Sequence, residues 1–227
     1  MKKVILIAGG SDGLGKSVAE SLVKENIVVI LSPSEEKLKK VAKEVGCEYV
    51  VADVTDYESL TLAIAKVIKQ HERIDCLVNC AGLWIQGELD VNDPKLIKKV
   101  VEVNTLGTIL MTKAVIPQMK KQKSGLIINI NSQSGIYPKE ERSVYVASKF
   151  AVTGFERSLQ PELAKYGIVV TGILPGGMKT NFFEKANNAK DKTNFIDTKE
   201  VAEVVEFLLK RKSTTVITEI GIKDINN

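Results

Sequence analysis

Three side chains in the middle of the chain have the types and spacing needed to move a proton. Tyr145 and Lys149 lie four residues apart in a stretch whose pattern predicts a helix from Ser143 onward. On a helix, side chains with this spacing share one face about one turn apart. A phenol has an ordinary pKa of about 10, and a neighbouring ammonium lowers it. The pair therefore predicts a tyrosine that acts as a general acid or base.

Ser132 is the third member of this set. The apolar run Gly125–Ile130 predicts a buried strand, and Ser132 follows at its carboxyl end, where open α/β sheets bind their ligands. Its hydroxyl would hydrogen-bond the same substrate oxygen as Tyr145. In a plainer interpretation Tyr145 packs in the core, Lys149 is solvated and Ser132 caps a turn. Because that interpretation fits most isolated Tyr-x-x-x-Lys pairs, the surrounding sequence has to decide.

Length and composition frame this site. The chain has 227 residues, of which 44% are hydrophobic and 26% charged, which is ordinary for a soluble globular protein. We expect one domain over residues 1–227 with a large buried core. The N-terminal Met1-Lys-Lys leads into an apolar run too short for a signal peptide or a membrane span. We therefore expect a cytoplasmic protein with no membrane partner.

Composition also argues against other kinds of site. The net charge of +4 comes mainly from lysines scattered over predicted helix faces, and aromatic residues are sparse, so nucleic-acid binding is not expected. Three cysteines are too few and too unevenly placed for a disulfide framework. His71 has no partners at the spacing of metal ligands, so no metal site is expected.

A glycine-rich turn follows the first predicted strand. The aliphatic run Val4–Ala8 leads into Gly9-Gly-Ser-Asp-Gly-Leu-Gly15, which precedes a helical pattern over residues 16–25. Glycines permit a tight turn and let backbone N–H groups approach a pyrophosphate at the helix N-terminus. A glycine-rich turn alone is equally well explained as a structural turn. Its place directly after the first strand favours a dinucleotide site.

The remaining pattern alternates strands with helices. The helix that starts near Ser143 should continue to about Tyr166, with a kink or break at Pro161. Such alternation predicts a parallel sheet covered by helices on both faces. We expect further strands at 27–31, 49–52, 76–78, 168–174 and 215–222, and further helices capped by Ser34, by Thr55 or Asp56 and by Thr198, the last ending near Lys212, with one more after Pro94.

Two other features of the sequence require an explanation. Asn104 lies within the apolar helical stretch after Pro94, where a buried amide is costly unless it is hydrogen-bonded. We therefore expect Asn104 to have a partner or a task. Residues 182–195 are polar apart from Phe182, Phe183 and Phe195 as apolar anchors, which predicts a substrate loop or a short helical lid.

Taken in order, these motifs resemble the short-chain dehydrogenase/reductase family over essentially the whole chain. The resemblance implies an α/β, Rossmann-type, doubly wound fold with a mostly parallel seven-stranded sheet and helices on both faces. It also implies a nicotinamide dinucleotide, NAD(P)(H), and hydride transfer between the nicotinamide and a carbonyl or alcohol carbon. The motifs are Gly9-x-x-x-Gly13-x-Gly15, Asp53, Asn79-Cys-Ala-Gly82, Asn104, Ser132, Tyr145-x-x-x-Lys149 and Pro175-Gly176.

The resemblance implies four catalytic residues. Tyr145 would donate a proton in carbonyl reduction and accept one in alcohol oxidation. Lys149 would lower the pKa of Tyr145 and hydrogen-bond the nicotinamide ribose. Ser132 would orient the substrate oxygen, and Asn104 would support a water-linked proton path from Lys149. These roles agree with the proton chemistry argued above from the residue types.

The resemblance also implies the residues that contact the cofactor. The glycine turn would meet the pyrophosphate through Gly9, Ser11, Asp12, Gly13, Leu14 and Gly15. Asp53 and Val54 would meet the adenine, and Asn79, Ala81 and Gly82 the central part of the cofactor. On the nicotinamide side the implied contacts are Tyr145, Lys149, Pro175, Gly176, Met178 and Thr180.

The choice between NAD(H) and NADP(H) depends on the end of the second strand. An acidic residue there bonds a ribose 2′-hydroxyl, whereas an Arg meets a 2′-phosphate. This chain has Ser32-Pro33-Ser34, which is neither acidic nor basic. The hydroxyls of Ser32 and Ser34 can donate to a phosphate, although Asp12 would repel one. On balance we expect NADP(H).

The leading interpretation is an NAD(P)-dependent oxidoreductase of the carbonyl reductase or alcohol dehydrogenase type, acting on a small or medium carbonyl or hydroxyl compound. A catalytically silent nicotinamide-binding sensor or scaffold is the alternative, but such a protein would be expected to lose Ser132, Tyr145 or Lys149. A sugar-nucleotide epimerase or dehydratase is disfavoured because those chains need extra residues for a substrate domain. The resemblance also implies a homodimer or homotetramer packed through the helices that begin near Pro94 and Ser143.

Overall fold

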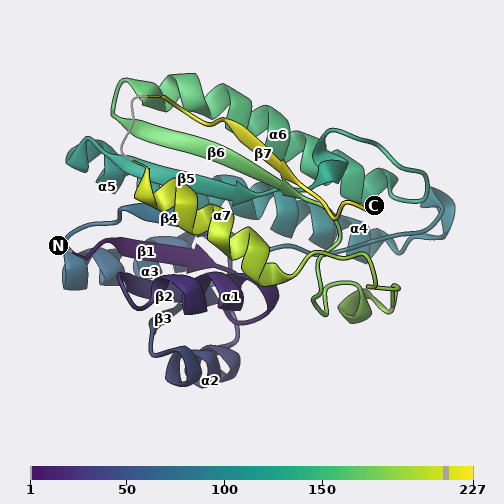
Figure 1. Ribbon diagram of the computed structural model, residues 1–227, viewed down its shortest axis with the longest axis horizontal. Helices are drawn as coiled ribbons and strands as arrows, with labels where there is room; N and C mark the ends of the chain where they lie inside the picture. Colours follow the sequence, from purple (N-terminus) through teal and green to yellow (C-terminus); the bar gives the residue numbers. More distant parts are fainter. Residues whose placement is uncertain (1, 212–214, 227) are drawn as a thin grey trace.

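A parallel sheet runs through the centre of the protein (Figure 1). The computed structural model describes residues 2–211 and 215–226. Its seven strands lie in the order β3-β2-β1-β4-β5-β6-β7, with parallel neighbours throughout. The strand order reverses between β1 and β4, which is the kind of point where open α/β sheets bind ligands. The strands are β1 (Val4–Ala8), β2 (Ile27–Ser32), β3 (Glu48–Val51), β4 (Cys76–Asn79), β5 (Gly125–Ile130), β6 (Ile168–Pro175) and β7 (Glu219–Ile222).

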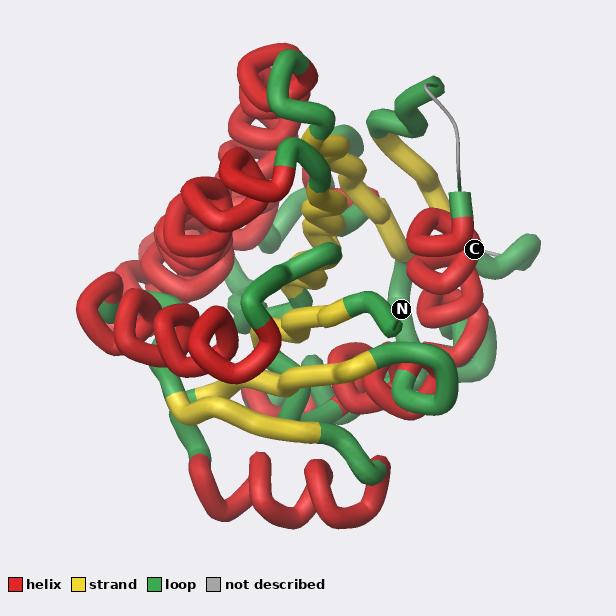
Figure 2. The backbone as a smooth tube through the Cα atoms, turned by 90° about the vertical axis from the view of Figure 1, so that its left-hand side faces the viewer, coloured by secondary structure: helices red, strands yellow, loops and turns green. Residues whose placement is uncertain are grey.

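Helices cover both faces of the sheet (Figure 2). One face packs against α1 (Gly13–Leu22), α2 (Glu35–Val45) and α7 (Thr198–Lys210). The other packs against α3 (Tyr57–His71), α5 (Thr108–Gln122) and α6 (Ser143–Ala164). A shorter helix, α4 (Pro94–Val101), continues through a π-helical segment, Glu102–Gly107, into α5. The predicted doubly wound, Rossmann-type fold is confirmed.

The central strand β1 shows why the strands are apolar along their whole length. All five of its residues are buried. Ile5 and Ile7 belong to the hydrophobic cluster under α1, α2 and α7, while Val4, Leu6 and Ala8 belong to the cluster on the opposite face. A strand covered on both sides has no solvent face, so its sequence carries no alternation of polar and apolar residues.

Two predicted helix boundaries are wrong for local reasons. α1 begins at Gly13 rather than at Lys16, because the glycine turn itself enters the helix. α7 is capped by Asp197 and not by Thr198, since the Asp197 carboxylate accepts a hydrogen bond from the Lys199 N–H at 2.9 Å. The predicted end of α7 at Lys212 lies outside the described residues.

The last strands also depart from prediction. β7 begins at Glu219, because the chain in front of it is held to β6 by a side chain: the Thr171 hydroxyl donates to the Ile217 carbonyl at 2.7 Å. α6 ends at Ala164, two residues before the predicted end near Tyr166, and it continues through Pro161.

One stretch, Pro94–Gln122, is long and apolar enough by composition to span a membrane. In the fold it is α4, the π-helical segment and α5. Met111, Val115 and Met119 on α5 are fully buried in the cluster between α3, α6 and the sheet. These apolar residues of α5 therefore have a place in the core.

Candidate active site

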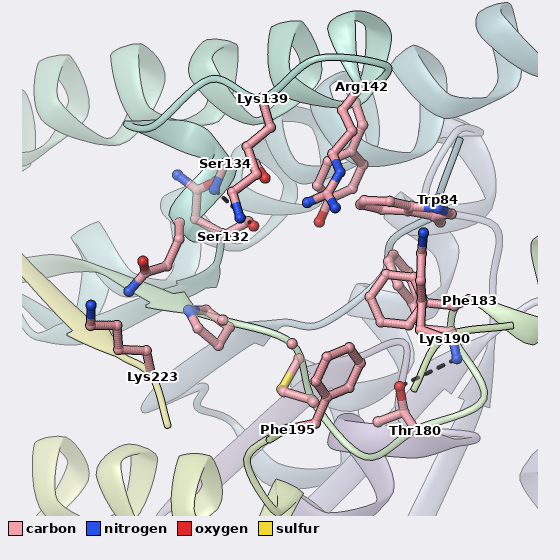
Figure 3. Close-up of a pocket in the computed structure, with 18 of the residues that line it drawn as sticks. Trp84, Ser132, Ser134, Lys139, Arg142, Thr180, Phe183, Lys190, Phe195 and Lys223 are labelled. Atoms are coloured by element: carbon pink, nitrogen blue, oxygen red, sulfur yellow. Dashed lines mark hydrogen bonds between the residues drawn. The ribbon is translucent and has the colours of Figure 1, made fainter. Parts of the chain in front are cut away.

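A cavity of about 560 Å³ opens where β5 and β6 end (Figure 3). Its wall combines segments that are distant in sequence. Ser132 comes from the end of β5, Tyr145 from the first turn of α6, and Pro175 from the end of β6, while Trp84 follows β4 and Phe183 comes from the predicted substrate loop. The parallel sheet brings these groups together because its strands all end at the same edge.

Tyr145 is buried in the cavity wall, with 5% of its surface exposed. The Trp84 ring packs against it, with 4.5 Å between the ring centroids. Burial raises the pKa of Tyr145 to about 12, while a hydrogen bond with Ser132 and the charge of Arg142 act to lower it. The phenol is therefore protonated at neutral pH, the form required of a proton donor.

Lys149 is also buried, and it does not dominate the environment of the Tyr145 hydroxyl. Its Nζ donates to the Ile130 carbonyl at 3.0 Å and lies 5.9 Å from the centroid of the Tyr145 ring. Burial lowers the pKa of Lys149 to about 8, against the opposing charges of Glu156 and Cys80. The pKa of Tyr145 is raised overall in this structure, because burial of the phenol outweighs the effect of nearby charge. The predicted lowering of that pKa by Lys149 stays a prediction.

Ser132 has both of the properties weighed from the sequence. It stands at the N-cap of a short 3-10 turn, Gln133–Gly135, where its Oγ accepts from the Ser134 N–H at 3.1 Å. Ser132 also acts on Tyr145 and lowers the pKa of that phenol. The structural role and the site role are therefore compatible.

Asn104 lies in the π-helical segment and is fully buried. Its Oδ1 accepts from the Leu83 N–H at 2.7 Å, and its Nδ2 donates to the Leu83 carbonyl at 3.0 Å and to the Ser148 hydroxyl at 3.1 Å. The expected hydrogen-bonding partner is confirmed. The amide fixes the segment beside Trp84 and joins it to α6 one residue before Lys149.

The glycine turn has the shape of an anion cradle. Gly9 and Gly13 have φ values of +80° and +49°, which disfavour any side chain. A Cβ on Gly15 would lie 2.3 Å from the Gly9 carbonyl oxygen, so only glycine allows this close packing. α1 begins directly at the turn with no acidic residue in its first turn, and the Asp12 side chain makes no capping hydrogen bond. The backbone N–H groups of a helix N-terminus in this arrangement favour a phosphate.

Two other residues of the glycine turn that were predicted to contact the cofactor differ in burial. Ser11 is half-buried within the turn, whereas Leu14 is buried and packs in the cluster under α1. Leu14 therefore offers only its backbone to a ligand. Ala81 lies against the turn, since a Cβ on Gly9 would come within 2.7 Å of the Ala81 nitrogen.

Near β3 and β4, the side chains predicted to contact the cofactor mostly form hydrogen bonds to other residues of the protein. The Asn79 amide donates to Thr112 and Asn129 at 3.1 and 2.9 Å, so its side chain faces the interior. The Asp53 carboxylate accepts from the Thr55 N–H and hydroxyl at 2.9 and 2.7 Å.

Val54 and Gly82 complete this part of the site. Val54 is buried against the π-helical segment, where a Cβ on Gly107 would lie 2.7 Å from its Cγ2. Gly82 faces Asn104 and the Phe182 ring, and a Cβ there would lie 3.6 and 3.7 Å from them.

Most residues predicted for the nicotinamide side line the cavity, and Lys149 is the exception: the lining includes Tyr145, Pro175, Gly176, Met178 and Thr180. Met178 pairs with Ile196 in an isolated parallel bridge, and the Thr180 N–H donates back to the Met178 carbonyl at 2.8 Å. This bridge closes the base of the predicted substrate loop. The loop is also tied down by an ion pair between Lys185 and Asp12 and by a hydrogen bond from Lys190 to Gln86 at 2.7 Å.

The end of β2 carries a buried polar atom that has no protein partner. Ser32 is 6% exposed, and its Oγ makes no hydrogen bond to any described residue. Asp12, which was expected to repel a phosphate, is neutralised by Lys185. The glycine cradle and the unpartnered Ser32 hydroxyl together fit a dinucleotide that runs from β2 to the cavity.

Several residues of the cavity wall were not predicted. Arg142 lies three residues before Tyr145, and its guanidinium is 5.2 Å from the Trp84 ring centroid. Trp84 follows Gly82 by two residues. Both could have been found by their spacing from predicted motifs, whereas Lys139, Lys190 and Lys223 converge on the cavity only through the tertiary fold.

Comparison with known proteins places this site in a family. The family model described as short chain dehydrogenase matches residues 3–191. An uncharacterized oxidoreductase of Staphylococcus saprophyticus is 34% identical over 98% of this chain and 97% of its own. A 3-oxoacyl-[acyl-carrier-protein] reductase of Thermotoga maritima is 32% identical over 96% of this chain and 94% of its own.

A solved structure agrees with these relatives. The alcohol dehydrogenase of the archaeon Thermococcus sibiricus, complexed with 5-hydroxy-NADP, superimposes with a TM-score of 0.91 at 26% identity, covering 100% of this chain and 98% of its own. The matched residues 3–191 include both the glycine turn and the Tyr145-Lys149 pair. This chain belongs to the short-chain dehydrogenase/reductase family of oxidoreductases.

Proposed function

We propose that this protein is a carbonyl reductase, working in reverse as an alcohol dehydrogenase, with Tyr145 as its general acid and base. One observation carries the proposal: the protonated Tyr145 phenol and the Ser132 hydroxyl line one cavity, which lies at the same sheet edge as the glycine cradle. A proton donor and an anion cradle at one edge are the parts that a nicotinamide-dependent reduction needs.

The chemistry divides between cofactor and protein. When bound, a reduced nicotinamide cofactor supplies a hydride to the carbonyl carbon. Tyr145 gives its proton to the carbonyl oxygen, so that one hydride and one proton convert the carbonyl into an alcohol. The Ser132 hydroxyl hydrogen-bonds the same oxygen and stabilises the charge that develops on it. In the oxidation direction Tyr145 takes the proton back.

Lys149 and Asn104 support this step. Lys149 is protonated below its pKa of about 8, and its charge favours the tyrosinate left when Tyr145 gives up its proton. Asn104 holds Leu83 and, through it, the Trp84 wall of the cavity. The water-linked proton path from Lys149 through Asn104 and the Lys149 bond to the nicotinamide ribose stay predictions.

The identity of the cofactor is inferred from the residues at two points of its predicted path. The glycine cradle takes the pyrophosphate, and the buried Ser32 hydroxyl offers a donor beside the adenosine ribose. Because Lys185 neutralises Asp12, the main objection to a 2′-phosphate is weakened. We therefore propose NADP(H) as the preferred cofactor. Tighter binding of NADH than of NADPH in parallel titrations would reverse this assignment.

A spectrophotometric assay tests the function itself. Purified protein is incubated with NADPH or NADH and a panel of aldehydes and ketones, and loss of absorbance at about 340 nm reports oxidation of the cofactor. We expect turnover with at least one carbonyl class. Cofactor binding without turnover across the panel would favour the nicotinamide-binding sensor instead.

A further inference from the structure

The charged residues that line the cavity are all cations. Figure 3 shows Lys139, Arg142, Lys190 and Lys223 around its opening, on different segments of the chain. No Asp or Glu occurs among the described residues of the cavity wall. The four residues come from the loop before α6, the start of α6, the substrate loop and the chain after β7, so their convergence is a property of the fold.

These cations lack carboxylate partners within the described parts of the chain. Some lysines elsewhere are paired: Lys16 with Glu44 at 2.6 Å, Lys39 with Glu35 at 2.9 Å and Lys210 with Glu206 at 2.5 Å. Of the four at the cavity, Lys190 donates to the neutral Gln86 amide and Arg142 stacks on Trp84. The cations of the cavity wall are therefore not held in ion pairs among the described residues, and the acid close to Lys190 is Glu141, which bonds the other end of the Gln86 amide.

Arg142 is the cation nearest to the chemistry. It is half-buried, its guanidinium lies 5.2 Å from the Trp84 ring centroid, and Trp84 in turn packs on Tyr145. Its charge also acts on the Tyr145 hydroxyl. A substrate whose carbonyl oxygen meets Tyr145 would therefore place neighbouring atoms beside a guanidinium, a group whose fork matches a carboxylate.

The nicotinamide end of the predicted cofactor path enters the cavity, but the phosphate-binding end of that path does not account for these charges. None of the glycine-turn residues between Gly9 and Gly15 lines the cavity, and neither does Ser32. The cations thus belong to the substrate side of the site. Four aromatic rings in the same wall provide an apolar surface: Trp84, Phe182, Phe183 and Phe195.

We propose that the natural substrate is a carbonyl acid, a compound with an apolar or aromatic body and a carboxylate close to the reacting carbonyl, and that Arg142 is the residue that selects the carboxylate. Lys139, Lys190 and Lys223 raise the local concentration of anions at the entrance. The inference rests on the proposed carbonyl reduction and adds the class of substrate to it.

Matched substrates test the selection. Benzoylformate and its methyl ester differ at the carboxylate and are compared with saturating NADPH in the wild type, in Arg142→Gln and in Lys66→Gln. Lys66 is an exposed lysine on α3, far from the cavity wall, and controls for the change in net charge. We expect Arg142→Gln to lower kcat/KM for the acid about tenfold or more relative to the ester, since a charge-assisted hydrogen bond is lost. Lys66→Gln should leave the ratio unchanged.

The ester also separates selection from a general effect on Tyr145. Because Arg142 acts on the pKa of Tyr145, its loss can slow both substrates equally. The inference would be overturned if Arg142→Gln lowered kcat/KM equally for the acid and the ester. It would also be overturned if rising salt left the wild-type ratio of kcat/KM for acid and ester unchanged. Carbonyl reduction itself would stand in both cases.

A binding measurement keeps the test independent of turnover. Trp84 is the only tryptophan of the chain and lies in the cavity wall, so its fluorescence reports ligands that enter. Hexanoate is titrated against hexanamide in wild type and Arg142→Gln. Binding of hexanoate but not hexanamide, lost in Arg142→Gln, supports the carboxylate site. That result would hold even if no carbonyl compound were reduced, and the proposed function would then fail on its own. Equal binding of the two ligands would overturn the inference.

Discussion

At the scale of single residues, burial decides protonation more than sequence spacing does. The Tyr-x-x-x-Lys spacing correctly put Tyr145 and Lys149 on one helix, but it said nothing about how deeply each side chain is buried. The phenol has its pKa raised to about 12 and the ammonium has its pKa lowered to about 8. Lys149 also has a flexible four-carbon stem, and only the fold shows that its Nζ bonds the Ile130 carbonyl.

A buried carboxyl behind the site follows the same rule. Glu156 on α6 is 3% exposed and accepts weak hydrogen bonds from Asn129 and Asn131 at 3.3 and 3.4 Å. Burial raises its pKa to about 7, helped by Glu219 and opposed by the two amides and Lys149. Between about pH 4.5 and pH 7, Glu156 is therefore protonated in the folded state and ionised in the unfolded state.

We predict that Glu156→Gln stabilises the protein at alkaline pH only. The folded state binds more protons than the unfolded one in this range, so the wild type loses stability as pH rises from about 4.5 to 7. Gln cannot ionise and avoids that loss, which is worth about 3 kcal/mol at most. Urea unfolding at pH 5 and pH 8 measures it, with the exposed Glu203→Gln as control. A gain of equal size at both pH values would contradict the assignment to ionisation.

At the scale of elements, Asn104 shows what a sequence can and cannot indicate. A polar amide in an apolar helix predicted a hydrogen-bonded partner, and the structure supplies three hydrogen bonds, two with Leu83 and one with Ser148. The π-helical segment that aims this side chain was not predicted. An extra residue in one helical turn leaves the apolar pattern almost unchanged, so no periodicity argument detects it.

The substrate loop is joined to the glycine turn by the Lys185–Asp12 ion pair. Because the Lys185 and Asp12 side chains are 52% and 37% exposed, the pair contributes little to stability, at most about 1 kcal/mol. Its larger effect is to cancel the charge of Asp12 beside the cradle. Sequence spacing offered no sign of this contact between residues 173 positions apart.

Lys185→Met should therefore weaken NADPH binding about threefold to tenfold with little change in Tm, because an uncancelled Asp12 repels phosphate. NADH, with one phosphate group fewer, should lose less affinity. Lys192→Met is the matched control, since Lys192 pairs with Glu184 inside the same loop. Calorimetric titration measures both cofactors, and an equal loss in the two variants would assign the effect to loop disorder instead.

At the scale of the whole molecule, the fold could be predicted from the sequence because a helix separates each strand from the next. That alternation predicts the parallel, doubly wound sheet, and the sheet in turn brings Ser132, Pro175 and the glycine turn to one edge. The cationic wall was not readable, because Lys139, Lys190 and Lys223 are 33 to 84 residues apart and each resembles an ordinary surface lysine. Only the closed fold shows that they converge.

The outer surface of α4, the π-helical segment and α6 exposes apolar side chains. Val101 and Leu106 are each 42% exposed and Phe150 is 43% exposed, and the three segments that carry them pack together. We propose that this surface joins two copies of the chain. Burial of such side chains against a second copy is the usual way that an exposed apolar patch is removed from water.

Phe150→Glu should shift the protein toward the monomer. A carboxylate buried in an apolar interface costs several kcal/mol, which is on the order of a thousandfold in the dissociation constant. Light scattering with size-exclusion chromatography measures the mass. Leu62→Glu on α3, at an exposed apolar position away from this surface, serves as control. A wild type that is already monomeric would contradict the proposal.

We propose that two tasks are divided along the sheet edge: the glycine cradle binds the cofactor, and Tyr145 moves the proton. The measurement that tests it most directly is Tyr145→Phe, which keeps the ring against Trp84 and removes only the hydroxyl. The variant should bind NADPH with unchanged affinity while kcat for carbonyl reduction falls by about 10³-fold. A variant that keeps the wild-type kcat would contradict Tyr145 as the proton donor.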